Sequence, residues 1–150
     1  MTKLDLENYV PGLLLWLSNK IASSATQVYR SRFGIGVTDW RVLAYFEVYP
    51  WTTASSACEL MGLDKAAVSR SIAFLVEGGW LNARPSGLRK VEYATTPRGK
   101  AFHGKVLQVA IAREQALLSG ISKADQKQLI RLLHLMLQNL EKVSAAGRED

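Results

Sequence analysis

The stretch LDKAAVSRSIAFLVEGGWL, residues 63–81, decides the fold that this sequence predicts. Asp64 is suited to cap a helix, because its carboxylate can accept hydrogen bonds from the free N–H groups of the first turn. Gly78 and Gly79 end that helix. Apolar residues at helical spacing form one face, expected to be buried: Val68, Ile72, Leu75 and Val76. The opposite face carries Lys65, Ala66, Ser69, Arg70 and Ala73.

A short helix and a tight turn precede this stretch. The helix runs from about Thr53 to Met61, and Gly62, which readily adopts a positive φ angle, ends it. Two helices joined in this way form the helix-turn-helix pattern, in which the second helix lies in the major groove of DNA. Here the second helix is the one that Asp64 caps.

A β-hairpin follows directly. Short strands at Trp80-Leu81 and at residues 91–95 flank a turn rich in proline, serine and glycine. We expect this turn to carry three cations, which are Arg84, Arg89 and Lys90. A basic hairpin beside a helix-turn-helix can reach phosphates or the adjacent minor groove.

Two helices are predicted before this region. The first runs from about Val10 to Tyr29, and its inward positions are Leu13, Leu14, Leu17, Ile21, Ala25 and Val28. Thr38 is the N-cap candidate of the second, with Asp39 in its first turn. The core-facing residues of the second helix are Val42, Leu43 and Phe46.

Two more helices are predicted after the hairpin. Thr96 and Pro97 open a long helix that ends near Leu118. Ser122 and Asp125 resemble a capping box for a last helix, which extends to Val143. Apolar residues cover more than one stripe of that helix, so a second chain is expected to cover the remainder. The predicted fold is mainly α, with six helices, a small β-hairpin wing and an obligate-type homodimer.

The distribution of charge singles out the middle of the chain. The formal net charge of the 150 residues is +6 at pH 7. Residues 1–63 carry five basic and five acidic side chains, whereas residues 64–105 carry eight basic and three acidic ones. Because the excess lies on the helix-turn-helix and the hairpin, an anionic partner such as duplex DNA is favoured for that region.

Little in the sequence favours an enzyme or a metal site. No nucleophile and base, and no paired carboxylates, stand out, and Gly34-Ile35-Gly36 lacks the strand and third glycine of a dinucleotide fingerprint. One cysteine and two distant histidines give no zinc-ligand spacing. The apolar run Gly12–Leu17 is too short to span a bilayer. We expect a cytoplasmic protein without cofactors, metal or a membrane partner.

Three stretches, in this order, resemble the MarR (multiple-antibiotic-resistance regulator) family of winged-helix transcription factors. They are residues 38–43 (TDWRVL), residues 63–81, and the hairpin with its exit, which contains Arg84-Pro85, Arg89 and residues 96–99 (TPRG). The resemblance covers the whole chain and implies a homodimeric regulator, expected to be a repressor, on a pseudo-palindromic operator. It also implies that residues 1–32 and 100–150 form a helical dimerisation region and residues 33–99 a DNA-binding domain. Wings of the family often carry an acidic residue where this chain has Gly87.

Residues of two kinds are candidates for binding. Those expected to contact DNA are Lys65, Ala66, Ser69, Arg70, Arg84, Arg89 and Lys90. Arg70 suits a guanine edge, and the wing cations suit phosphates. The resemblance also implies a pocket for a small, often aromatic, effector that loosens DNA binding. The candidate lining is Tyr9, Trp16 and Trp40, with Arg41 as a partner for a carboxylate.

Other interpretations remain open. Cys58 is either a small core residue or the thiol of a redox sensor that binds DNA. The chain could also be a helical protein-interaction module whose apolar last helix docks a partner, the basic hairpin being incidental. Of the histidines, His103 is expected at the surface and His134 at a dimer interface.

Overall fold

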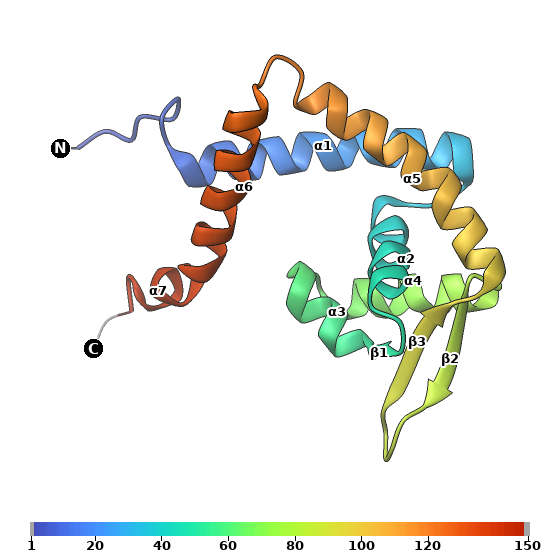
Figure 1. Cartoon of the computed structure of the whole chain (residues 1–150). Coiled ribbons are helices and arrows are strands. Elements are labelled where there is room, and N and C mark those ends of the chain that lie inside the picture. The colour runs from blue at the N-terminus through green and yellow to red at the C-terminus, as the bar shows by residue number, and fades with distance from the viewer. Residues whose placement is uncertain (1, 149–150) are drawn as a thin grey trace. The chain divides into compact units, whose positions relative to one another are not determined.

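The computed structural model describes residues 2–148 and divides into two compact units, Met1–Gln108 and Val109–Asp150. The helices are α1 (Val10–Phe33), α2 (Val37–Val48), α3 (Ala54–Met61), α4 (Lys65–Glu77), α5 (Pro97–Leu117), α6 (Lys123–Gln138) and α7 (Leu140–Ala145) (Figure 1). The strands are β1 (Thr52–Thr53), β2 (Leu81–Pro85) and β3 (Val91–Thr95). The mainly helical fold with a small wing is therefore confirmed.

The sheet has one strand more than the predicted hairpin. Strands β2 and β3 pair antiparallel, with Leu81 opposite Thr95 and Pro85 opposite Val91, as the sequence indicates. In addition, the two-residue strand β1 pairs with β3, which gives the order β1-β3-β2. A two-residue strand is too short to show periodicity in a sequence, so the pattern of residues could not reveal it.

The core of the first unit lies between α2, α3, α4 and the sheet. Val42, Leu43 and Phe46 of α2 are fully buried, as predicted. On α4, Val68, Ile72 and Leu75 are buried, but Val76 is 36% exposed, so its predicted inward position is wrong. The buried stripe follows steps of three and four residues, and Val76 lies one step of about 100° beyond Leu75.

Of the predicted helix starts, those at Thr53, Asp64 and Thr96 are correct and the one at Thr38 is wrong. Thr53 and Asp64 are N-caps whose side chains accept from Ser56 N and Ala67 N. Thr96 Oγ1 likewise accepts from Gly99 N over 2.9 Å. Thr38, however, lies inside α2, whose N-cap is Gly36. The start moves because the Asp39 carboxylate reaches back to accept from the N–H of Gly36.

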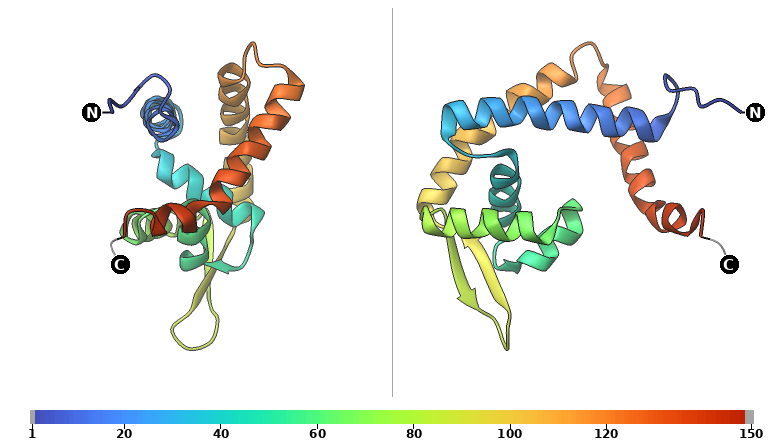
Figure 2. Two further views of the ribbon diagram at one scale, coloured as in Figure 1. Left: turned by 90° about the vertical axis from the view of Figure 1, so that its left-hand side faces the viewer. Right: turned by 180° about the vertical axis from the view of Figure 1, so that it is seen from behind.

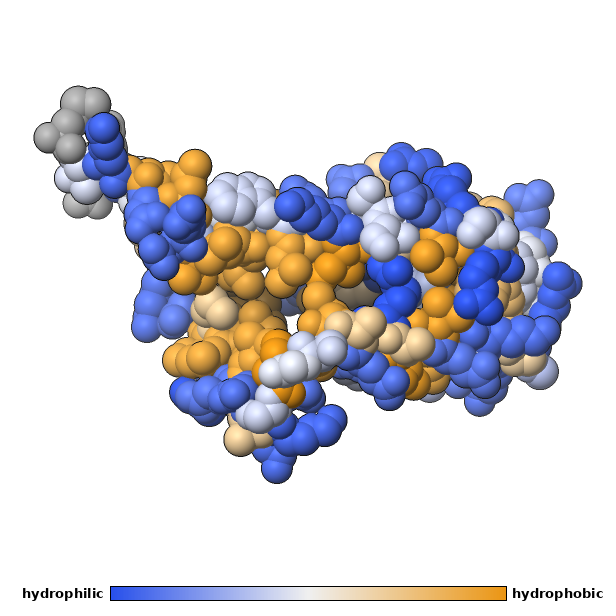
Figure 3. Space-filling model, turned by 90° about the horizontal axis from the view of Figure 1, so that it is seen from above, coloured by the Kyte–Doolittle hydropathy of each residue, from blue (hydrophilic) through white to orange (hydrophobic). Residues whose placement is uncertain are grey.

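Apart from Gly12, the first helix is buried only in its second half. Ala25 and Tyr29 are buried, in agreement with the predicted face for Ala25. Leu13, Leu14 and Leu17 are 40–49% exposed instead. Figure 3 shows apolar side chains gathered on the side of the molecule that is seen from above.

The predicted last helix is interrupted, so the described residues contain seven helices rather than six. Helix α6 ends at Gln138, and α7 begins at Leu140. Between them, the N–H of Asn139 is shared by the carbonyls of Leu135 and Met136, as is common at helix ends. Asparagine has a lower helix propensity than the leucines beside it, so Asn139 is a weak position in this segment.

The predicted start of α6 is confirmed: the Ser122 hydroxyl accepts from the N–H of Asp125. No residue of α6 or α7 is buried, so their apolar side chains are accessible within the described chain. Among the described residues, no helix is long and apolar enough to cross a membrane.

Candidate nucleic-acid interface

Helix α4 presents a small, exposed face. Lys65, Ala66, Ser69 and Arg70 are all exposed, as the sequence predicts. Gly62 ends α3 in the left-handed conformation (φ 62°), and Asp64 then caps α4, so the two helices meet through a tight turn. Figure 2 shows α3 and α4 joined in this way, with the wing hanging below α4. The face can approach a flat or grooved partner closely, because alanine and serine project little beyond the backbone.

A buried polar contact fixes α4 against α2. Ser71 is only 5% exposed, and its Oγ donates to Asp39 Oδ1 over 2.6 Å. The second oxygen of Asp39 accepts from the N–H of Gly36 over 2.8 Å. One carboxylate therefore holds both the start of α2 and the middle of α4. Sequence reasoning missed this contact, although a serine between Val68 and Leu75 on the inward face was the available signal.

Two hollows border the exposed face of α4. A hollow of about 440 Å³ is lined by residues of α1, α2 and α4, among them Arg30, Thr38, Asp39, Arg70 and Phe74. The other, of about 460 Å³, lies toward the wing and is lined among others by Ser69, Ala73, Ala83 and Tyr93. Arg70 and Ser69 thus lie on opposite borders of the same helix face.

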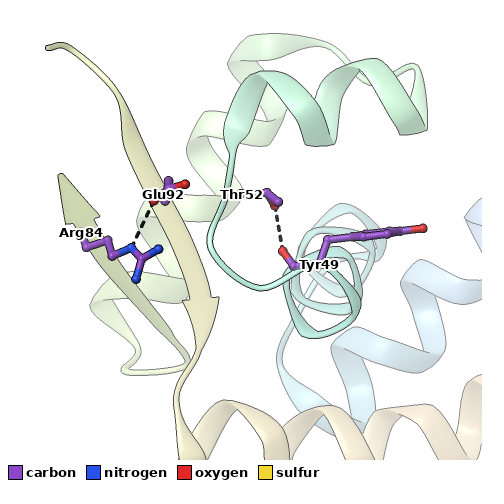
Figure 4. A network of polar contacts seen from close by, with 4 residues as sticks. All are labelled: Tyr49, Thr52, Arg84 and Glu92. Atoms are coloured by element: carbon purple, nitrogen blue, oxygen red, sulfur yellow. Dashed lines mark hydrogen bonds and ion pairs between the residues drawn. The ribbon is translucent and has the colours of Figure 1, made fainter. Parts of the chain in front are cut away.

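Arg84 is not part of the wing's turn. It lies in strand β2, where its Nε forms an ion pair with Glu92 Oε1 of β3 at 3.1 Å (Figure 4). Its guanidinium carbon also lies 4.1 Å from the centroid of the Trp51 ring. Its predicted place in the turn is therefore wrong. The guanidinium is engaged near the loop end of the β2–β3 ladder, where it joins β2 to β3 and to the turn before β1.

The turn that carries Trp51 is held by two hydrogen bonds. Thr52 Oγ1 donates to the carbonyl of Tyr49 over 2.8 Å (Figure 4), and the N–H of Trp51 donates to the carbonyl of Tyr93 over 2.7 Å. Trp51 itself has a φ of 58°, which is rare for a bulky residue. These contacts hold the indole where Arg84 can cover it.

The wing tip is a short loop with two exposed cations. The N–H of Ser86 donates to the carbonyl of Lys90 over 2.8 Å, which closes the loop. Gly87 and Arg89 both have left-handed backbones, with φ of 71° and 63°. Arg89 and Lys90 are exposed, as a contact with phosphate requires. The ion pair that braces this wing thus lies in the strands just below the loop, between Arg84 and Glu92, and not at Gly87.

The start of α5 packs against the exit of α4. Thr96 Oγ1 donates to the carbonyl of Gly79 over 2.7 Å, and Gly99 is buried against Trp80. A Cβ on Gly99 would lie 2.0 Å from the carbonyl oxygen of Trp80, so only glycine fits. This close approach fixes where the strand β2 leaves the helix-turn-helix.

The candidate effector residues do not come together within the described chain. Trp40 lies 6.2 Å from Tyr29 of α1 between ring centroids. Trp16 lies on the same helix as Tyr29, about 20 Å away along the helix axis at a rise of 1.5 Å per residue. Tyr9 precedes α1 as its N-cap, and Arg41 of α2 is half-buried. A single pocket in one chain therefore does not contain both tryptophans.

His103 is half-buried rather than at the surface. Its ring stacks on Trp40, with 5.1 Å between centroids and an interplanar angle of 22°. Burial lowers the pKa of His103 below its ordinary value of 6.5, and the nearby carboxylate of Glu47 partly opposes that shift. The neutral imidazole is thus the form that the fold prefers. His134, by contrast, is exposed on α6.

Cys58 lies on α3, half-buried against the core that contains Ala57. Over residues 2–148, no group of three or more His, Cys, Asp or Glu side chains is placed to hold a metal ion.

Comparison with solved structures gives extensive similarity over nearly the whole chain. A MarR/EmrR family transcriptional regulator from Acinetobacter sp. ADP1 superposes with a TM-score of 0.85 and 26% identity, covering 93% of this chain and 99% of the other. A mutant MarR from E. coli complexed with operator DNA gives 0.73 and 23%, covering 91% and 99%. FabT from Streptococcus pneumoniae in complex with DNA gives 0.67 and 20%, covering 89% and 96%. No protein-family model and no curated protein matches the chain.

Proposed function

Because this chain is a winged-helix protein of the MarR type, we propose that it is a sequence-specific DNA-binding transcriptional regulator. One observation carries the proposal: α4 combines an exposed face of Lys65, Ala66, Ser69 and Arg70 with an adjacent wing whose tip presents two cations. A helix with small side chains around one arginine fits the major groove, where a bidentate arginine–guanine pair discriminates between bases by about 1–3 kcal/mol.

The wing and the helix have different tasks in this proposal. Arg70 reads base edges, and Ser69 contacts a phosphate. Arg89 and Lys90 follow the phosphate backbone or the adjacent minor groove, which raises affinity without carrying sequence information in itself. Arg84 contributes by holding the wing in place through Glu92 and Trp51.

The functional unit is a homodimer in this proposal. The exposed apolar residues of α1, with Leu13, Leu14 and Leu17, and of α6, with Leu133 and Leu137, support a dimerisation region at residues 1–32 and 100–150. Two-fold symmetry then places the two α4 helices on half-sites about 10 base pairs apart, in a pseudo-palindromic operator. The protein acts as a repressor in the cytoplasm.

Release by a small aromatic ligand is part of the proposal. Trp16, Trp40 and Arg41 are its candidate contacts, with different chains of the dimer supplying the distant ones. An effector weakens DNA binding only to the extent that it prefers the form that does not bind DNA. Thermal unfolding and operator binding measured with a panel of aromatic acids test this: if neither changes, the effector hypothesis is wrong.

Selection of DNA from a random pool tests the proposed function. We expect a palindromic consensus, and binding of that DNA should weaken steeply with salt because each phosphate contact releases a counterion. Binding with neither sequence preference nor salt dependence would instead favour the helical interaction module. Peroxide treatment of the wild type and Cys58→Ser addresses the redox alternative, which requires that only the wild type lose its DNA binding.

A further inference from the structure

The wing carries an exposed apolar side chain at its tip. Leu88 is 96% exposed. The exposed large apolar residues of α1 and α6 are less accessible, and most of them are between a third and two thirds exposed. Its neighbours in sequence are Gly87 and Arg89, and the bond from Ser86 N to Lys90 O leaves just these three residues in the loop. Leu88 is therefore the most exposed large apolar residue of the described chain, and it lies at the centre of the wing's loop.

The backbone of the loop is built to present this residue. Gly87 and Arg89 adopt the left-handed conformation on either side of Leu88, at φ of 71° and 63°. Left-handed backbone at a residue with a Cβ is uncommon and costs free energy. Below the loop, Arg84 ties the strands together through Glu92 and stacks on Trp51. The loop that carries Leu88 is thus connected to two strands that Arg84 holds together.

The charge around Leu88 identifies its partner. Arg89 and Lys90 follow it directly and are exposed, so the tip attracts a polyanion. The minor groove of DNA combines a phosphate border with an interior where proteins insert leucine and similar side chains between base steps. An apolar residue followed by two cations matches that arrangement.

Building on the proposed function, we propose that Leu88 enters the minor groove beside the half-site that α4 reads. There its apolar side chain contacts the floor of the groove, while Arg89 and Lys90 contact the bordering phosphates. The contact makes Leu88 a specificity-determining residue at base pairs outside the reach of α4. A minor groove lined by A·T pairs suits it best, since the exocyclic amino group of guanine projects into the groove.

Fluorescence anisotropy with the selected operator tests this inference. We expect Leu88→Ala to weaken binding by about tenfold at every salt concentration, with the salt slope unchanged, since no phosphate contact is lost. Arg89→Ala should flatten the slope by about 0.9 for each wing. Leu60→Ala removes the same atoms from an exposed leucine of α3 and is the matched control, with wild-type affinity expected.

Base substitution identifies the groove. Replacing A·T pairs under the wing by G·C should weaken the wild type but hardly affect Leu88→Ala. Inosine·cytosine pairs, which lack the minor-groove amino group, should restore wild-type binding. Equal affinities of folded Leu88→Ala and wild type, on an operator that the wild type binds specifically, would overturn the role of Leu88 and leave the proposed function intact. Absence of specific DNA binding by the wild type would overturn both.

Discussion

Removal of the Ser71 hydroxyl is the sharpest perturbation of the way in which α4 is fixed. The hydroxyl is buried and donates to Asp39 Oδ1 over 2.6 Å. A hydrogen bond to a charged group contributes about 1.5–3 kcal/mol. Because Asp39 is only half-buried, water can replace part of the bond. We therefore expect Ser71→Ala to lower the free energy of unfolding by about 1–2 kcal/mol.

Substitution of Asp39, the acceptor of the Ser71 hydrogen bond, should lower the free energy of unfolding more than substitution of Ser71. Asp39→Ala leaves both the Ser71 hydroxyl and the N–H of Gly36 without their acceptor, so a loss of about 2–4 kcal/mol is expected. In the double variant the shared bond is lost only once. Its loss should therefore be smaller than the sum of the single losses by about 1–2 kcal/mol.

Urea unfolding followed by circular dichroism measures these values, at one protein concentration because association adds to the apparent stability. Ser69→Ala is the matched control: it removes an exposed hydroxyl two residues away and should change the free energy of unfolding by less than about 0.5 kcal/mol. If the losses for Ser71→Ala and Asp39→Ala add to within about 0.3 kcal/mol, the bond does not fix α4 and the reasoning is refuted.

Three further substitutions test other parts of the structure. Arg84→Ala should lower the free energy of unfolding by about 1 kcal/mol, since it removes an exposed ion pair and a cation–π contact, and an unchanged value would show that the brace does not stabilise the wing. Gly99→Ala should lower the free energy of unfolding, measured by thermal unfolding, by about 3 kcal/mol or more, because its Cβ would overlap the Trp80 carbonyl. Gly104→Ala on the same helix places its Cβ in open space and should not lower that free energy. Since burial lowers the pKa of His103 in the folded state, the unfolded chain binds more protons in acid, and stability should decrease as the pH falls below about 6.5. His103→Gln should make urea unfolding between pH 7 and pH 5 less dependent on pH, and an identical pH profile would contradict the assignment.

Local sequence signals predicted the helix-turn-helix and the wing well. The caps at Asp64, Thr96 and Ser122 depend on side chains that bond to a backbone N–H three residues later, so the sequence contains both partners close together. The burial of Val42, Leu43 and Phe46 follows from helical spacing alone. Such short-range rules suffice for the helix-turn-helix and for the ladder between β2 and β3.

Contacts between distant residues could not be predicted in this way. Ser71 and Asp39 are 32 residues apart, and nothing in either segment specifies the other. In the sequence, Arg84 resembles an exposed cation of the wing's turn, because nothing there indicates that its guanidinium lies over the ring of Trp51. These features require the three-dimensional arrangement.

The central claim is that α4 reads DNA through Arg70. The most direct test measures the affinity of wild type and Arg70→Ala for the selected operator and for operators with one base pair changed in each half-site, by fluorescence anisotropy at fixed salt. Arg131→Ala, which removes an arginine from α6, is the matched control. The account predicts that Arg70→Ala, while folded, loses about 1–3 kcal/mol of discrimination at one base pair of each half-site. A folded Arg70→Ala that keeps wild-type affinity and discrimination would contradict it.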